Sequence, residues 1–203
     1  HLHEPASTAQ APRTASPVKT LAREQKGRFF IAIGLMVVST AVNYLLNYVP
    51  TYATKTLHLP GQAAFSATLV AGIILTVVTP LMGLWAERIG RLPLMWGSLL
   101  LLLVTVWPGF WLMTRSVSPL SLCLLIGWMA LLKSVYFATV PSLMADLFPA
   151  ATRASGMAIS YNVAVTVFGG FAPFICTLLI TSTGTALAPS YYLMAVSLLS
   201  ACA

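Results

Sequence analysis

Long apolar runs separated by short polar gaps make up the chain after residue 28. Because an α-helix needs roughly 20 apolar residues to cross the hydrocarbon core of a bilayer, the runs predict six helices, over residues 29–50, 63–85, 92–113, 118–145, 155–181 and 189–203. The gaps are short, so we expect neighbouring helices to pack antiparallel. The last run is too short for a full span, and we expect a fragment whose final helix is truncated. The pattern predicts an all-α, polytopic transmembrane helix bundle over residues 29–203.

The first 28 residues differ in composition from the rest of the chain. Pro, Ala, Ser and Thr dominate them, and basic residues gather toward their end. Such a segment buries too little apolar area to fold by itself, so residues 1–28 are expected to be a linker. Over the whole chain 58% of the residues are hydrophobic and 7% are charged, whereas a soluble domain carries about 25% charged residues. Composition therefore indicates an integral membrane protein.

Basic residues are divided unequally between the two sides that alternating helices define. One side receives those before the first helix together with Arg88, Arg91 and Arg153, and the other has only Lys55 and Arg115. Since cytoplasmic loops are rich in Lys and Arg, the linker and the gap around Arg88 are expected to be cytoplasmic. The net charge of +7 could also indicate a protein that binds nucleic acid. The basic residues form no face beside stacking aromatics of the kind that binds nucleic acid, so we attribute the charge to membrane topology.

The gap GLWAERIGR, residues 83–91, concentrates charge between two apolar runs. Gly83 would let two helices approach closely, and Gly90 would permit a backbone angle that other residues resist. Glu87 and Arg88 end a helix, where charges bond to free backbone groups or to a neighbouring helix, and Arg91 can reach a lipid phosphate or a carboxylate. A simple positive-inside anchor is the alternative.

The gap also resembles a known signature. Six positions match the G-x-x-[AS]-[DE]-R-x-G-R-[RK] pattern of the major facilitator superfamily, with Leu92 in the last, usually basic, place: Gly83, Ala86, Glu87, Arg88, Gly90 and Arg91. Residues 146–162, DLFPAATRASGMAISYN, are similar to the segment that opens the eleventh helix in its metabolite:proton symporter subgroup. Relatives in that subgroup carry proline and betaine, citrate, 2-oxoglutarate or shikimate.

This resemblance implies the C-terminal six-helix half of a major facilitator fold in the bacterial inner (plasma) membrane. Residues 1–28 would then be the cytoplasmic loop that joins it to a missing N-terminal six-helix half. The resemblance also implies that residues 83–91, which we call the glycine-charge loop, latch a cytoplasmic gate. Asp146 and Arg153 would belong to the same gate, paired with that loop or with the other half. The predicted gate residues are Gly83, Glu87, Arg88, Gly90, Arg91, Asp146 and Arg153.

Transporters of this kind bind substrate near the bilayer midplane, so polar side chains midway along a span are candidate ligands. Lys133 lies about halfway along residues 118–145, where a charge costs roughly 2.5–3.5 kcal/mol on insertion scales. That cost is tolerable if the ammonium faces a wet cavity or meets an anionic group of the substrate. Tyr136, one turn on, would share its face. A lysine bonded to a backbone carbonyl for packing is the alternative.

The first predicted helix carries two polar stripes. Asn43 and Asn47 are four residues apart, with Ser39 one turn earlier, and Tyr44 and Tyr48 form an adjacent pair at the same spacing. These side chains are expected to form a cavity wall, with hydrogen bonding between helices as the alternative.

The fifth predicted helix offers Tyr161 and Asn162, although packing of small residues explains that face equally well. The predicted substrate-binding residues are therefore Lys133, Tyr136, Asn43, Asn47, Tyr44, Tyr48, Tyr161 and Asn162.

Titrating groups are scarce within the predicted spans. Glu87 and Asp146 lie at helix ends, and no carboxylate or histidine lies midway along a span. A proton-coupled carrier needs such a group in its pathway, supplied either by the missing half, which we favour, or by Lys133 itself. We expect no cofactor and no metal, because the sequence shows neither a nucleotide-binding loop nor a cluster with metal-ligand spacing.

We expect a fragment of a secondary active transporter, not an enzyme. It would move a small organic solute, an organic acid or a proline- or betaine-like compound, in symport with protons by alternating access. An uncoupled channel, or another polytopic membrane protein without coupling, is the alternative, but it leaves the glycine-charge loop without a purpose. A membrane-embedded enzyme requires paired acids, a histidine cluster or an activated nucleophile in the bilayer, and the sequence contains none of these within its predicted spans.

Overall fold

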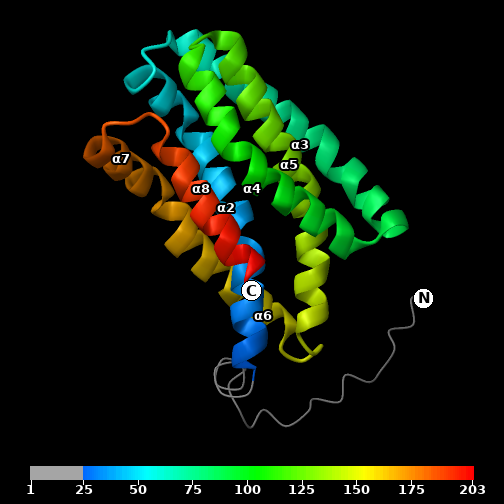
Figure 1. Ribbon diagram of the computed structural model, residues 1–203. Helices are drawn as coiled ribbons and strands as arrows, with labels where there is room; N and C mark the ends of the chain where they lie inside the picture. The colour runs from blue at the N-terminus through cyan, green and yellow to red at the C-terminus, as the bar shows by residue number, and fades with distance from the viewer. Residues whose placement is uncertain (1–24) are drawn as a thin grey trace, which may run out of the picture.

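The computed structural model describes residues 25–203, and all regular secondary structure in that range is helical (Figure 1). Most of the predicted linker, residues 1–24, lies outside the described residues. Its last residues belong to the first helix of the bundle, which begins at Lys26.

Five helical spans are long and apolar enough to cross a membrane. They are α2 (Lys26–Lys55), α3 (Gly61–Ile89), α4 (Arg91–Arg115), α5 (Pro119–Leu147) and the span Arg153–Thr183. The span Arg153–Thr183 consists of α6 (Arg153–Ala164), the π-helical segment η1 (Val165–Gly170) and α7 (Ala172–Thr183), and α8 (Ala188–Ala201) follows it. Hydrocarbon offers no partners to backbone N–H and C=O groups, so an apolar chain that crosses it pairs them within helices. The predicted all-α, polytopic bundle is confirmed.

Helix α2 is the centre of the bundle. It contacts α3, α5, α6, η1, α7 and α8, and most of its side chains between Ala32 and Ala53 are buried. It also continues through Pro50 to Lys55, beyond the predicted end at residue 50, because a proline inside a membrane helix is tolerated when other groups satisfy the freed carbonyl. All side chains that α2 contributes to a site therefore stand on one rigid element.

Helix α3 instead lies on the outside and packs mainly against α5 (Figure 1). A row of apolar side chains at four-residue spacing faces outward from it, each more than half exposed: Phe65, Leu69, Ile73 and Val77. On a protein in water, a row this long would be an association patch. On a membrane span such a row suits contact with lipid tails or with other membrane helices, as expected of an integral membrane protein.

The connections between helices gather at two ends of the bundle. Figure 1 shows the α2–α3 and α4–α5 connections together at one end, and the start of α2 with the α3–α4 and α5–α6 connections toward the other. Gly90, with φ +103°, is the single residue between α3 and α4, and this positive φ favours glycine. The end that holds Gly90 also holds Arg88, Arg91 and Arg153.

Candidate functional site

A polar cavity of about 440 Å³ lies between α2, α5 and the span that begins with α6. Its volume is within the roughly 300–1,000 Å³ usual for small-molecule sites. Five of the eight predicted substrate-binding residues line it, namely Lys133, Asn43, Asn47, Tyr44 and Tyr161. The other lining residues are Met36, Ser39, Thr40, Phe137 and Val165. Their role in binding a substrate remains a prediction.

Lys133 stands at the middle of α5, 14 residues from Pro119 and 14 from Leu147. Its Nζ donates a hydrogen bond of 2.6 Å to Oδ1 of Asn43 on α2. The centroid of the Phe137 ring lies 5.9 Å from the same nitrogen, near the limit of a cation–π contact. The ammonium thus meets a neutral amide and an aromatic ring inside the bundle, and the alternative of a lysine bonded to a backbone carbonyl is not what the structure has.

Three predicted substrate-binding residues do not line this cavity. The Tyr136 side chain is 2% exposed, and its hydroxyl lies between Leu35 O (2.8 Å) and Ser200 Oγ (3.0 Å). Residues three apart on a helix differ by about 60° in direction, and that is enough to turn Tyr136 away from the face of Lys133 and into the core.

The other two residues, Tyr48 and Asn162, form their hydrogen bonds away from this cavity. The Tyr48 hydroxyl pairs with Thr177 Oγ1 on α7 at 2.8 Å. Asn162 is exposed, and its Nδ2 donates to Ala158 O one turn earlier on its own helix. Both side chains thus lie outside the cavity that contains Lys133.

Sequence reasoning missed several lining residues. Phe137 follows Lys133 by four residues, so the one-turn spacing of helix faces would have found it. Ser39 was not missed, because it lies one turn before Asn43 on the polar stripe that was expected to form a cavity wall, and it does line the cavity. Met36, Thr40 and Val165 carry no such signal, because apolar and small polar residues are common throughout these helices.

Three tyrosines of α2 form what we call the tyrosine ladder: Tyr44, Tyr48 and Tyr52. Two of its contacts are hydrogen bonds, one between the hydroxyls of Tyr48 and Thr177 and one from the Tyr52 hydroxyl to Ala186 O at 2.6 Å. The ring of Tyr44 instead lies against Gly169, where an added Cβ would come within 2.7 Å of a ring atom. The ladder thus fastens α2 to three successive parts of the chain, η1, α7 and the α7–α8 connection.

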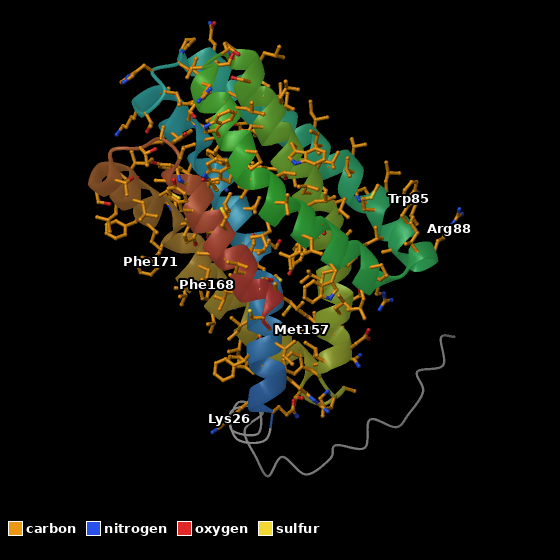
Figure 2. All side chains as sticks on the ribbon, viewed as in Figure 1. Lys26, Trp85, Arg88, Met157, Phe168 and Phe171 are labelled. Atoms are coloured by element: carbon orange, nitrogen blue, oxygen red, sulfur yellow. The ribbon has the colours of Figure 1, made fainter. Side chains whose placement is uncertain are left out.

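The π-helical segment η1 adjoins the cavity through Val165. A π-helix displaces carbonyls from the regular pattern of hydrogen bonds, and short π segments are frequent at functional sites. Here the Tyr192 hydroxyl of α8 donates to Phe168 O. Figure 2 labels Phe168 and Phe171 on this stretch of the span. The irregular backbone thus has a partner on α8, as a break within a membrane span requires.

The predicted gate residues lie at the basic end of the bundle. Arg91 Nη1 and Asp146 Oδ2 form an ion pair of 3.1 Å between the start of α4 and the end of α5. Asp146 thus pairs with the glycine-charge loop, one of the two arrangements that we expected. Arg153 instead donates through Nε to Phe148 O at 3.4 Å. Both members of the ion pair are substantially exposed, so the pair itself contributes only about 0–1 kcal/mol.

Glu87 and Arg88 are exposed at the tip of α3, where Figure 2 labels Arg88. Within residues 25–203 neither forms an ion pair. Glu87 lines an open hollow beside Gly90 and Arg91. Gly83 was expected to allow a close helix approach, but no described atom of a neighbouring helix lies within 4 Å of the position that its Cβ would take. Gly90 has its predicted backbone angle, and Gly83 has no close helix neighbour within the described residues.

The apolar spans and the cavity define a polytopic helical membrane protein with a site of solute size. The family described as "Sugar (and other) transporter" matches residues 4–202. The chain belongs to this family, and the predicted membership of the major facilitator superfamily is confirmed.

Curated relatives are solute transporters of the predicted subgroup. The chain is 31% identical to the ectoine/proline transporter ProP of Corynebacterium glutamicum, over 81% of this chain and 33% of the relative. It is 30% identical to the citrate-proton symporter of Klebsiella pneumoniae (80% and 37%), and 29% identical to the proline/betaine transporter of Escherichia coli K12 (88% and 36%). The chain spans about a third of the length of the curated relatives that it matches.

Proposed function

We propose that the chain is the C-terminal half of a secondary active transporter that moves a small organic solute together with protons. The names of the relatives support this proposal. Two of them describe transporters of ectoine, proline or betaine, and the third describes a citrate-proton symporter. One observation carries the proposal: a polar cavity opens at the middle of α5, around Lys133. A carrier that works by alternating access holds its solute at this depth, between its two helix bundles.

The basic end of the bundle is the proposed cytoplasmic face, in a bacterial inner membrane. Here the ion pair of Arg91 with Asp146 would belong to a gate that opens and closes with the transport cycle. Two conformations of such a protein differ by only a few kcal/mol, so a contact worth about 1 kcal/mol or less can still shift their balance. Glu87 and Arg88 are available to meet the N-terminal half.

The proton-carrying group is proposed to lie in that N-terminal half. Neither a carboxylate nor a histidine lines the cavity that the described residues form, and a coupled carrier needs a titrating group that reaches the pathway.

Uptake into vesicles by the full-length transporter tests the proposal. The panel is citrate, 2-oxoglutarate, proline and betaine, each with and without an imposed proton gradient. We expect at least one of them to accumulate above its external concentration only when the gradient is present, and a protonophore to abolish that accumulation. Solute that merely equilibrates, with or without the gradient, would instead favour an uncoupled channel.

A further inference from the structure

The contact between Lys133 and Asn43 leaves a positive charge without a balancing negative one. Lys133 Nζ donates to Asn43 Oδ1 at 2.6 Å, and an ammonium has three N–H donors. No carboxylate lines the cavity that residues 25–203 form, and the ion pair within that range lies elsewhere, at Arg91. The cavity of the described half is therefore cationic.

The direction of the Asn43 amide follows from the same contact. An ammonium can only donate, so the amide must present its oxygen to Lys133, and its Nδ2 then faces away with two N–H donors. Asn43 itself lines the cavity. The pair thus offers positive charge and donors from opposite helices, α5 and α2.

This combination favours one class of ligand. A carboxylate accepts hydrogen bonds from an ammonium and from an amide, and charge-assisted bonds of this kind are roughly twice as strong as neutral ones. A zwitterion such as betaine brings its own cation, which Lys133 repels. The site therefore suits a solute whose carboxylates are not balanced by an ammonium.

We propose that the cavity selects net-anionic carboxylates and that Asn43 determines this selectivity by bonding Lys133 without neutralising it. The inference rests on the transport function proposed above. An aspartate in place of Asn43 has nearly the same shape and would keep the contact, but its negative charge would cancel that of the ammonium.

The test compares citrate and betaine uptake by variants of the full-length transporter. We expect the wild-type protein to prefer citrate, and Asn43→Asp to lower its kcat/KM for citrate by about tenfold or more, the scale of one lost charge-assisted bond. Lys133→Asn should do the same, while the exchange Lys133→Asn/Asn43→Lys, which moves the ammonium across the contact, should restore citrate uptake. The exchange keeps the same two groups at the contact, so restored citrate uptake, with all single and double variants equally abundant in the membrane, assigns the loss in the single variants to the charge and not to folding.

Two controls make the same chemical change elsewhere. Asn47→Asp adds a carboxylate to the same cavity one helical turn from the Lys133–Asn43 bond, so its effect on citrate should be smaller than that of Asn43→Asp. Gln62→Glu makes the change on the exposed start of α3 and should leave the citrate-to-betaine ratio unaltered. Each variant is first checked for its abundance in the membrane.

The outcomes separate this inference from the proposed function. If the wild-type protein accumulates none of the four panel solutes, the proposed function fails. If it accumulates betaine in preference to citrate, or if Asn43→Asp and Lys133→Asn leave the ratio unchanged, the transporter stands and the assigned selectivity is overturned. Failure of the exchange variant, with both single variants impaired and all proteins present, would show that a positive charge at this contact does not by itself confer the citrate preference, and would also overturn the assigned selectivity.

Discussion

Tyr136→Phe separates a structural from a substrate-binding role for the single tyrosine of α5, which is buried. Its hydroxyl contacts Leu35 O at 2.8 Å and Ser200 Oγ at 3.0 Å, and Ser200 Oγ also donates to Gly34 O at 2.8 Å. The contacts join α5 to α2 and α8. Two hydroxyl protons serve these three contacts, so at most two are full hydrogen bonds at any moment.

The magnitude follows from what phenylalanine leaves behind. Leu35 O remains inside a regular helix and Ser200 keeps its bond to Gly34, so no buried acceptor loses all its partners. The loss is therefore about one net hydrogen bond, ~0.5–1.5 kcal/mol in general and about 0.6 kcal/mol on average between membrane helices. We expect the free energy of unfolding to fall by about 1 kcal/mol, while the KM of the transported solute stays unchanged because the ring does not line the cavity.

The assay pairs SDS-induced unfolding of the full-length protein in bicelles with uptake kinetics. Ser200→Ala is the matched variant at the other end of the contact. Because the two changes remove a shared interaction, the double variant should lose less stability than the sum of the two single variants. A tenfold rise in KM for Tyr136→Phe with unaltered stability would refute this reasoning and place the hydroxyl against the solute.

Three further predictions concern the backbone and the gate. Gly169→Ala should lower stability by about 1–3 kcal/mol, because its Cβ overpacks against the Tyr44 ring, and thermal unfolding of the purified protein measures this. Gly90→Ala should cost about 1–3 kcal/mol through its positive φ, whereas Gly83→Ala, which meets only open space, should not destabilise the protein in the same assay. Arg91→Ala should change stability by less than about 1 kcal/mol; a larger loss, or one that persists in high salt, would contradict an exposed ion pair.

Hydropathy predicted the spans because the bilayer allows so few alternatives. An apolar run of sufficient length must form a helix, and this holds whether the run is interrupted by Pro50, Pro80, Pro108 or Pro141, all of which lie inside helices. Helix periodicity likewise placed Asn43 and Asn47 on one cavity-lining face of α2. Local rules therefore suffice for the spans and for which side chains of one helix share a face.

The same rules fail where one helix face borders both the cavity and a neighbouring helix. Lys133 and Tyr136 were assigned to one face, yet only Lys133 lines the cavity. The direction of Tyr136 depends on where α2 and α8 pack, and Ser200 is 64 residues away in sequence. The pairing of Arg91 with Asp146 across 55 residues was one of two arrangements that the sequence left open, for the same reason.

The π-helical segment η1 is the clearest case of structure that the sequence pattern does not contain. VTVFGG has one polar side chain, Thr166, and otherwise continues the apolar run, so hydropathy predicts one uninterrupted helix over residues 155–181. What distinguishes this stretch is its surroundings. The Tyr44 ring of α2 occupies the space beside Gly169, and the Tyr192 hydroxyl of α8 donates a hydrogen bond to Phe168 O. A side chain at position 169 would exclude that ring, and without Tyr192 the displaced carbonyl would lose its partner in an environment without water. The break is therefore a property of three packed helices, and only the glycines, which permit the close approach, give any sign of it in the sequence.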